Sequence, residues 1–179
     1  MTSLALALAL AAAVPSAPEA AAAAFTCPAG TERRGAVPPE GFELWCERGE
    51  ERPERRREGP YRAFYEDGKL AKEMSFREGK PDGSFLEWHR NGKAFQAGAY
   101  RDGERDGLFR NWYVDGTLEE ECEYQRGARH GRFATFWPNG RPRAEGRYCR
   151  DLQCGTWRSW DEGGRELGKI HYEEIRATP

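Results

Sequence analysis

Isoleucine is almost missing from this chain of 179 residues, because it occurs only at Ile170 and Ile175. Buried strands of parallel α/β sheets are rich in Val and Ile, so this scarcity argues against a doubly wound fold. A mean hydropathy of −0.90 also argues against a large aliphatic core. Phe, Tyr and Trp nevertheless contribute 9, 7 and 6 residues, a share that argues against simple disorder. The length allows one ordinary domain or a short repeat array.

An excess of one sign of charge is absent as well. The chain carries 28 basic and 30 acidic residues, and residues 59–179 hold 21 of each. A neutral surface has no long-range attraction for phosphates. We therefore expect no nucleic-acid partner, and the charge count disfavours a membrane lipid.

Motifs for catalysis are missing. The sequence contains no G-x-S-x-G, H-E-x-x-H, P-loop or GxGxxG pattern. Its three histidines, His89, His130 and His171, fall at different positions of the repeat described below, so repetition does not gather them. The sequence predicts no enzyme, no catalytic residue, no cofactor and no metal site.

The first 24 residues resemble a signal peptide. Leu4 to Val14 form an apolar run of eleven residues, too short to span a bilayer, and small residues follow at 20–24. Phe25-Thr26 before Cys27 is not a lipobox, so no lipid anchor is expected. We expect a secreted, periplasmic or cell-envelope protein. A disordered Ala-rich arm or a misassigned start is the other interpretation, since no Lys or Arg precedes the run.

The cysteines agree with export. Cys27 and Cys46 bracket a loop rich in Pro and Gly, and a disulfide there would close a small cap, contributing about 3 kcal/mol. Cys149 and Cys154 flank a predicted hairpin turn and are expected to form a second bridge, which leaves Cys122 as a free thiol. The alternative is five reduced thiols in a cytosolic protein.

Internal repetition is the strongest feature of the sequence. Five units of 24 residues begin at Gly59, Gly83, Gly107, Gly131 and Gly155, without insertions. The chain thus divides into the signal-like segment 1–24, a cap and charged linker 25–58, and the repeats 59–179. We refer to these units as repeats 1 to 5 and count positions from each first glycine.

Five positions recur in the repeats. Aromatic residues stand at +2 (Tyr61, Phe85, Phe109, Phe133, Trp157), at +5 (Phe64, Trp88, Trp112, Phe136, Trp160) and at +17 (Phe76, Tyr100, Tyr124, Tyr148, Tyr172). A second glycine stands at +9 (Gly68, Gly92, Gly116, Gly140, Gly164), after Asp or Asn in four units. A third glycine follows at Gly79, Gly103 and Gly127, and is replaced by Asp151 and Ile175.

The glycines predict turns between strands. Asp-Gly and Asn-Gly are the strongest two-residue hairpin signals, and we expect a type I′ turn with positive φ at both residues. The third glycine then turns the chain into the next hairpin. The predicted fold is all-β: an elongated single-layer antiparallel β-meander of five hairpin repeats, about 45–50 Å long, with a small disulfide-closed N-terminal cap. Residues 168–179 would supply the last strand.

The aromatic spacing leaves one question open. Positions +2 and +5 are three residues apart, so a regular strand would place them on opposite faces. Either both faces carry aromatic rows or a bulge intervenes.

These units resemble MORN repeats, in the bacterial variant found in YwqK-type proteins. The resemblance rests on G-x-aromatic-x-x-aromatic, then Asp/Asn-Gly, then Glu-x-x-Tyr, and covers about two thirds of the chain. It implies an elongated β-meander and a binding or scaffolding role, with an antitoxin or a membrane-lipid module as alternatives. Gly98 and Gly146 depart from the bulkier Met74 and Cys122 at the same position.

Two surfaces are candidates for a protein partner, whose identity and oligomeric context the sequence does not define. The +6 residues form one stripe, Tyr65, His89, Tyr113 and Trp137, which ends at Asp161. They would either pack between hairpins or lie exposed as a contact row. The second surface is the acidic group at Glu119, Glu120, Glu121 and Glu123, either a charged edge against aggregation or a docking site for a basic partner.

Overall fold

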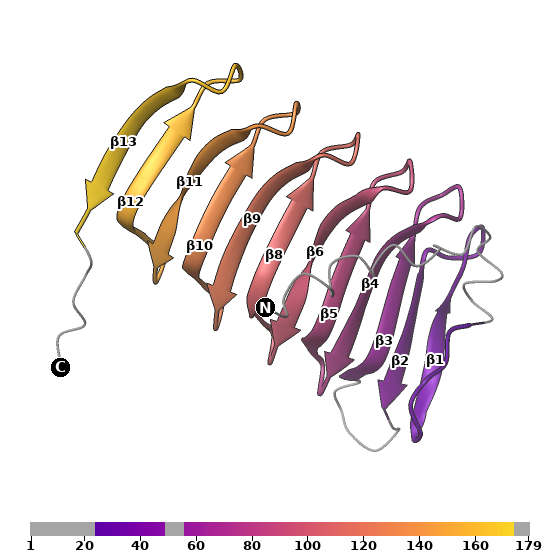
Figure 1. The fold of residues 1–179 in the computed structure, drawn as a ribbon. Helices are drawn as coiled ribbons and strands as arrows, with labels where there is room; N and C mark the ends of the chain where they lie inside the picture. Colours follow the sequence, from indigo (N-terminus) through magenta and orange to yellow (C-terminus); the bar gives the residue numbers. More distant parts are fainter. Residues whose placement is uncertain (1–23, 49–55, 174–179) are drawn as a thin grey trace, which may run out of the picture.

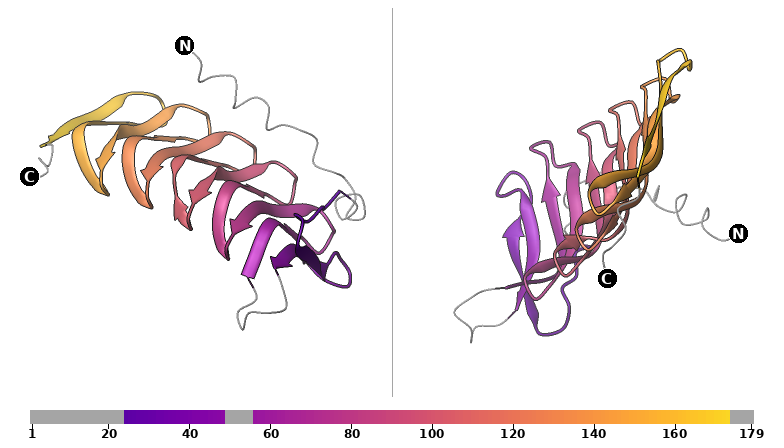
Figure 2. Two further views of the ribbon diagram at one scale, coloured as in Figure 1. Left: turned by 90° about the horizontal axis from the view of Figure 1, so that it is seen from below. Right: turned by 90° about the vertical axis from the view of Figure 1, so that its left-hand side faces the viewer.

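The computed structural model describes residues 24–48 and 56–173, which form one open antiparallel sheet of 13 strands (Figure 1). Residues 1–23, with nearly all of the signal-like segment, lie outside the described residues. No helix in the described part is long and apolar enough to cross a membrane. Figure 2 shows the hairpins side by side in a single curved layer. The all-β meander predicted from the repeats is confirmed.

Neighbouring strands in the sheet follow the chain order. The single exception is β7, a two-residue strand that pairs with β6 before β8 continues the sheet. The strands are β1 (Thr31–Ala36), β2 (Glu43–Arg48), β3 (Arg56–Phe64), β4 (Leu70–Arg77), β5 (Lys80–Trp88), β6 (Ala94–Arg101), β7 (Glu104–Arg105), β8 (Gly107–Trp112), β9 (Leu118–Gln125), β10 (Ala128–Phe136), β11 (Pro142–Cys149), β12 (Leu152–Trp160) and β13 (Glu166–Tyr172).

The Asp/Asn-Gly turns join the two strands within each repeat, but their predicted type is wrong. Only the glycine has a positive φ in these pairs, as at Gly68 with 82°. The backbone carbonyl of Tyr65 accepts a hydrogen bond from the Gly68 N–H at 2.9 Å, and the backbone N–H of Tyr65 donates to the Lys69 carbonyl at 2.8 Å. This is a three-residue loop, a type I turn followed by a left-handed glycine. The Asp67 carboxylate accepts a hydrogen bond from the backbone N–H of Lys69, two residues further along the chain, at 3.1 Å.

The type I′ turns lie at the other end of the hairpins, where one repeat passes into the next. Arg126 and Gly127 have φ of 50° and 81°, and the strand pair Gln125–Ala128 closes around them. Glu78-Gly79, Asp102-Gly103 and Arg150-Asp151 behave alike, with both φ angles positive. The ten predicted turn glycines all have φ between 65° and 116°, but only the five at +9 lie in turns. The prediction is wrong for the five first glycines, which lie within strands or, at Gly107, at the start of one.

The two aromatic positions lie on opposite faces, and bulges are present as well. Trp45 of β2 pairs with Tyr61, whereas its neighbours Leu44 and Cys46 pack with Phe64. Successive residues of a strand point to opposite faces, so Tyr61 and Phe64 do too. The register shifts once within every hairpin, directly before the +5 aromatic. The sheet therefore has aromatic rows on both faces and also a bulge before each +5 aromatic, so both interpretations of the spacing apply.

The N-terminal cap closes as predicted. Cys27 and Cys46 form a disulfide with a Cα–Cα distance of 5.6 Å. Beside it Phe25, Leu44, Phe64 and Leu70 form a buried cluster, which joins the cap to repeat 1. The cap thus adds apolar burial at the N-terminal end of the single-layer sheet.

The remaining cysteines also match the prediction. Cys149 and Cys154 form the second disulfide, across the type I′ turn at Arg150-Asp151. Cys122 is a free thiol with 1% of its surface exposed, between the rings of neighbouring repeats.

The sheet has its edges at β1 and β13, which corrects one interpretation. The glutamates 119–123 belong to β9, which lies inside the sheet between β8 and β10. They do not form a charged edge. The last strand, predicted from residue 168 onward, instead begins at Glu166, and residues 174–179 lie outside the described part.

Candidate partner-binding surface

The predicted stripe Tyr65, His89, Tyr113 and Trp137 forms a hydrogen-bonded ladder between repeats. Each side chain lies just after the first strand of its hairpin and reaches the backbone carbonyl of the +5 residue in the next repeat. The contacts are Tyr65 Oη to Trp88 O at 2.5 Å, His89 Nε2 to Trp112 O at 2.9 Å, Tyr113 Oη to Phe136 O at 2.9 Å and Trp137 Nε1 to Trp160 O at 3.1 Å. Burial raises the pKa of the Tyr65 and Tyr113 phenols, which keeps them protonated as donors.

The rings of this ladder are half-buried rather than free. The Arg90 guanidinium lies 5.1 Å from the Tyr65 ring, and that of Arg143 lies 4.8 Å from the Trp137 ring. Phe95 covers His89 at 5.0 Å between ring centroids. The structure therefore combines both interpretations of the stripe: its polar edges hold neighbouring repeats together, while part of each ring remains at the surface.

The stripe ends in repeat 5. In repeat 5 the +6 residue is Asp161, whose carboxylate accepts the Arg165 N–H of its own turn at 2.8 Å. Asp161 thus caps the ladder of the described repeats.

A second aromatic row covers the face that carries Tyr61. It consists of the +2 and +17 rings, which meet mostly edge-on at 5.1–5.9 Å, for example Tyr100 with Phe109 and Tyr148 with Trp157. Each +17 residue lies opposite the first glycine of its repeat on the neighbouring strand, as Tyr148 does opposite Gly131. Because glycine has no side chain, it leaves room for the ring.

Gly98 and Gly146, the departures from the repeat, let rings of neighbouring repeats touch. Phe85 and Phe109 stack at 6.4 Å across Gly98, and Phe133 meets Trp157 at 5.3 Å across Gly146. A Cβ at Gly98 would lie 2.6 Å from the Phe109 ring. At the bulkier Cys122 position the same register places Phe109 on one side of the cysteine and Phe133 on the other.

Arginines at +22 lie over this ring row, and the sequence analysis did not single them out. The Arg105 guanidinium carbon is 4.8 Å from the Phe109 ring and 5.2 Å from the Tyr124 ring. Arg129 lies 4.1 Å from the Tyr148 ring, and Arg57, at the same position before repeat 1, lies 4.9 Å from Tyr61. The signal was present in the repeat alignment, because residues 57, 105 and 129 share one column.

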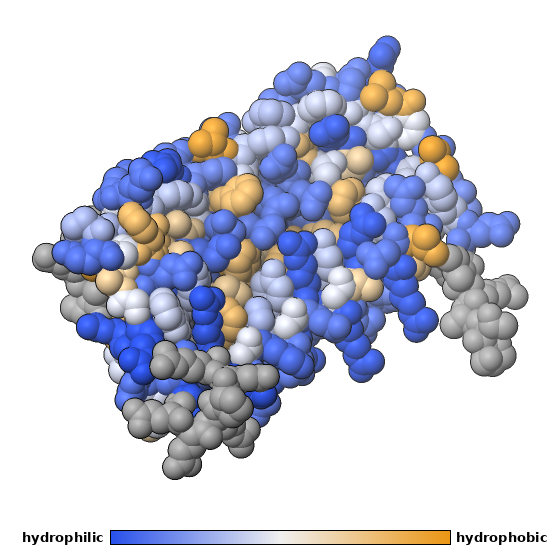
Figure 3. All heavy atoms as spheres, turned by 180° about the vertical axis from the view of Figure 1, so that it is seen from behind, coloured by the Kyte–Doolittle hydropathy of each residue, from blue (hydrophilic) through white to orange (hydrophobic). Residues whose placement is uncertain are grey.

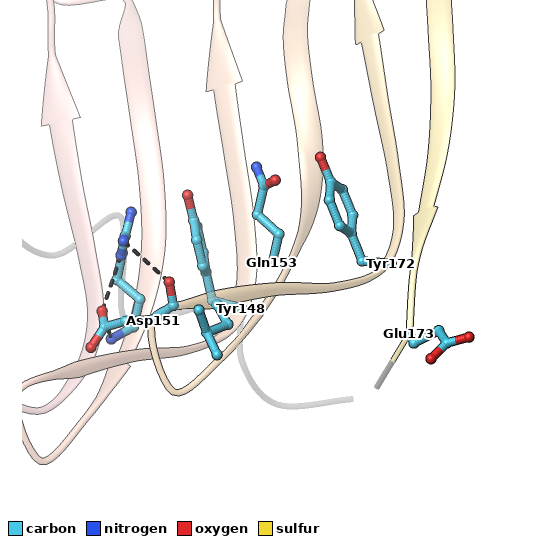
Figure 4. Close-up of a pocket in the computed structure, with 7 residues that line it drawn as sticks. Tyr148, Asp151, Gln153, Tyr172 and Glu173 are labelled. Carbon is cyan, nitrogen blue, oxygen red and sulfur yellow. Dashed lines mark hydrogen bonds and ion pairs between the residues drawn. The ribbon is translucent and has the colours of Figure 1, made fainter. Parts of the chain in front are cut away.

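A shallow pocket opens at the C-terminal end of the row (Figure 4). It has a volume of about 570 Å³, and its lining includes Tyr148, Gln153, Tyr172 and Glu173. Figure 4 shows Gln153 between the two tyrosine rings, with all three side chains extending in the same direction.

Exposed apolar side chains elsewhere are scattered. Phe42, Phe95, Leu108, Val114, Leu152, Leu167 and Ile170 are the large ones in the described part. On the face drawn in Figure 3, the most hydrophobic residues form separate patches among hydrophilic ones. No group of three or more His, Cys, Asp or Glu in the described residues is placed to hold a metal ion.

The acidic strand β9 is partly neutralised by neighbouring arginines. The Glu121 carboxylate forms ion pairs with the guanidinium groups of Arg110 at 3.6 Å and Arg132 at 3.7 Å. The Glu123 carboxylate accepts a hydrogen bond from the backbone N–H of Arg132 at 2.8 Å. Burial raises the pKa of the Glu120 carboxyl, and the nearby Glu119 adds to that rise. Docking of a basic partner at these glutamates stays a prediction.

Comparison with known proteins identifies the repeat type. The family model described as MORN repeat variant matches residues 57–78 and 105–126. The two matches begin 48 residues apart, two periods of the 24-residue repeat, so they share one register. No curated protein matches the chain.

One solved structure, titled "Crystal Structure of TarM", is similar at 12% sequence identity with a TM-score of 0.34. The match covers 70% of this chain and 21% of that one, so the chain spans about a fifth of its length.

Proposed function

We propose that this protein, which carries MORN variant repeats at 57–78 and 105–126, is a non-enzymatic protein-binding scaffold of the cell envelope or exterior. MORN repeats are in general protein-binding or lipid-binding modules. The two disulfides of the chain are consistent with an oxidising compartment.

The observation that carries this proposal is the ladder of Tyr65, His89, Tyr113 and Trp137. Each ring is held by a hydrogen bond to the next repeat, so it loses little side-chain entropy when a partner packs on it. A row of rigid rings at regular spacing suits an extended protein surface. The near-neutral charge of the repeats favours a protein over an anionic lipid surface.

The test must remove ring area without breaking the ladder. His89 occupies the same position as Tyr113 and Trp137 and makes the same hydrogen bond through Nε2. Tyr113→His and Trp137→His together therefore keep the contacts between repeats while shrinking the aromatic surface. The wild-type and double-variant chains are crosslinked to, and recovered from, the native envelope fraction.

We expect the wild-type chain to recover one protein in near-equal amount and the double variant to lose most of it at an unchanged melting temperature. If both chains recovered the same amount of the partner protein, the stripe would not be the binding surface. Recovery of anionic lipid alone would replace protein binding by lipid binding. A toxin as the recovered protein would identify the antitoxin role that the YwqK-type resemblance implies.

A further inference from the structure

The pocket at the C-terminal end of the ring row occupies a place that repeats 2 and 3 fill with arginine, whereas repeat 1 has Pro81 at this position. In repeats 2 to 4 the +22 residue lies opposite the +17 tyrosine of the same repeat, on the neighbouring strand. Arg105 pairs with Tyr100, Arg129 pairs with Tyr124, and Gln153 pairs with Tyr148. Gln153 therefore stands where Arg105 and Arg129 stand in the two preceding repeats.

In those repeats the guanidinium bridges to the tyrosine of the next repeat. Arg105 donates from Nη1 to the Tyr124 hydroxyl at 3.1 Å and lies over that ring. Arg129 lies 4.1 Å from the Tyr148 ring centroid. A cation over an aromatic face is attracted by the ring quadrupole, so each of these arginines is held by the rings beside it.

Gln153 does not reproduce this contact. Its side chain is shorter and uncharged, and the hollow of about 570 Å³ lies around it with Tyr148 on one side and Tyr172 on the other (Figure 4). The pocket thus keeps two aromatic walls but has no cation from the +22 position.

The charges around the hollow favour a cation. Arg129 lines it, but its guanidinium is paired with the Asp151 carboxylate at 3.1 Å. Glu173, exposed at the opposite side, adds a carboxylate. The three charged side chains of the lining sum to one negative charge.

We propose that this pocket binds an arginine side chain of the partner protein, whose guanidinium takes the place that Arg105 and Arg129 take in their own repeats. The inference rests on the proposed protein-binding function and names one recognition element of the partner. The pocket lies by the type I′ turn of repeat 4, at the opposite strand ends from the ladder, so the two contacts can be tested separately.

The test titrates the full chain with N-acetyl-L-arginine amide and follows the ring signals of tyrosines by NMR. The neutral isostere N-acetyl-L-citrulline amide is the matched ligand. Arg176 lies outside the described residues and is changed to Gln in every chain, so that its own guanidinium cannot compete. We expect saturable shifts of the Tyr148 and Tyr172 signals, with citrulline binding roughly tenfold weaker.

Two variants at one position separate binding from folding. Gln153→Arg supplies a guanidinium from the chain itself and should abolish the shifts, whereas Gln153→Ala leaves the hollow open and should retain them. Absence of saturable tyrosine shifts, equal binding of citrulline, or undiminished binding by Gln153→Arg would each overturn the proposal. None of these results bears on whether the ladder captures a partner protein. If the wild-type chain captured no partner protein while the pocket still bound arginine, only the proposed function would be contradicted.

Discussion

At the scale of the residue, the +15 position shows how one side chain decides whether neighbouring rings meet. Its occupants are Met74, Gly98, Cys122, Gly146 and Ile170. Rings of adjacent repeats meet where glycine stands, at Gly98 and Gly146, whereas in repeat 3 the buried Cys122 side chain occupies this position. The sequence revealed the irregular column, but its reason appeared only with the ring contacts.

Gly146→Ala tests this packing. The new Cβ would collide with the Trp157 ring, so we expect a loss of about 1–3 kcal/mol in the free energy of unfolding. Gly168→Ala is the matched control, because nothing lies within 4 Å of a Cβ there, and it should change stability by no more than about 0.5 kcal/mol. Urea unfolding of the two variants measures both. Equal effects would contradict the role of Gly146.

Cys122 carries a pH-dependent contribution to stability. Burial raises the pKa of its thiol from 9.0 to about 11. The unfolded chain therefore loses the proton first, so the contribution is fully present below pH 9 and is lost as pH rises to 11. We expect no reaction with iodoacetamide at pH 8 until the chain unfolds, and a fall in unfolding free energy between pH 9 and 11.

Unfolding curves across this pH range provide the check, with Cys122→Ala as the reference for other groups such as Tyr61, whose pKa burial raises to about 12. The wild-type chain should lose more stability than the variant between pH 9 and 11. Rapid alkylation of the folded chain at pH 8 would contradict the burial of this thiol.

At the scale of the element, the hairpin has two turns that resemble each other in sequence and differ in geometry. The Asp/Asn-Gly turn uses the acid or amide to accept a backbone N–H two residues on, as Asp115 does from Thr117 at 2.8 Å. The type I′ turn needs two residues with positive φ, and Arg126 adopts 50° there. A dipeptide rule alone placed the type I′ turn at the wrong end, because loop length and strand register select the turn type.

Introducing Asn-Gly at each turn tests this assignment. Arg126→Asn places a residue that tolerates positive φ in the type I′ turn and should stabilise the chain by about 0.5–1 kcal/mol. Asp115→Asn creates the same dipeptide in the other turn, where the first residue needs no positive φ, and should be nearly neutral. Thermal unfolding compares them, and the reverse order would show that the turns are misassigned.

At the scale of the whole molecule, stability is expected to be local. Each strand pairs only with its neighbours in one layer, so the array approximates a chain of nearest-neighbour contacts. The cap is joined to repeat 1 through a cluster that includes Leu44 and Phe64, and it contains the disulfide Cys27–Cys46.

Removal of that disulfide tests local stability. With Cys27→Ala and Cys46→Ala we expect a loss of about 3 kcal/mol confined to the cap. Hydrogen exchange should speed up in β1, β2 and β3, while β8 to β12 keep their protection. Uniform acceleration along the chain would instead demonstrate that the whole sheet unfolds as one cooperative unit.

The sequence by itself determined the repeat length, the strand-turn order, the single-layer sheet and both disulfide pairs. It could do so because glycine spacing and alternation act within one hairpin, and the hairpin recurs without insertions. The stripe was identified as a row for the same reason, since every member shares one position in the repeat.

Only the tertiary structure decided which turn is type I′, that β9 lies inside the sheet, and that the stripe residues bond to the next repeat. It alone showed the hollow at Gln153, where the two preceding repeats hold Arg105 and Arg129. These features depend on contacts between strands of different repeats, such as Tyr113 with Phe136 across 23 residues. Local patterns carry no information on such contacts until the register between repeats is set.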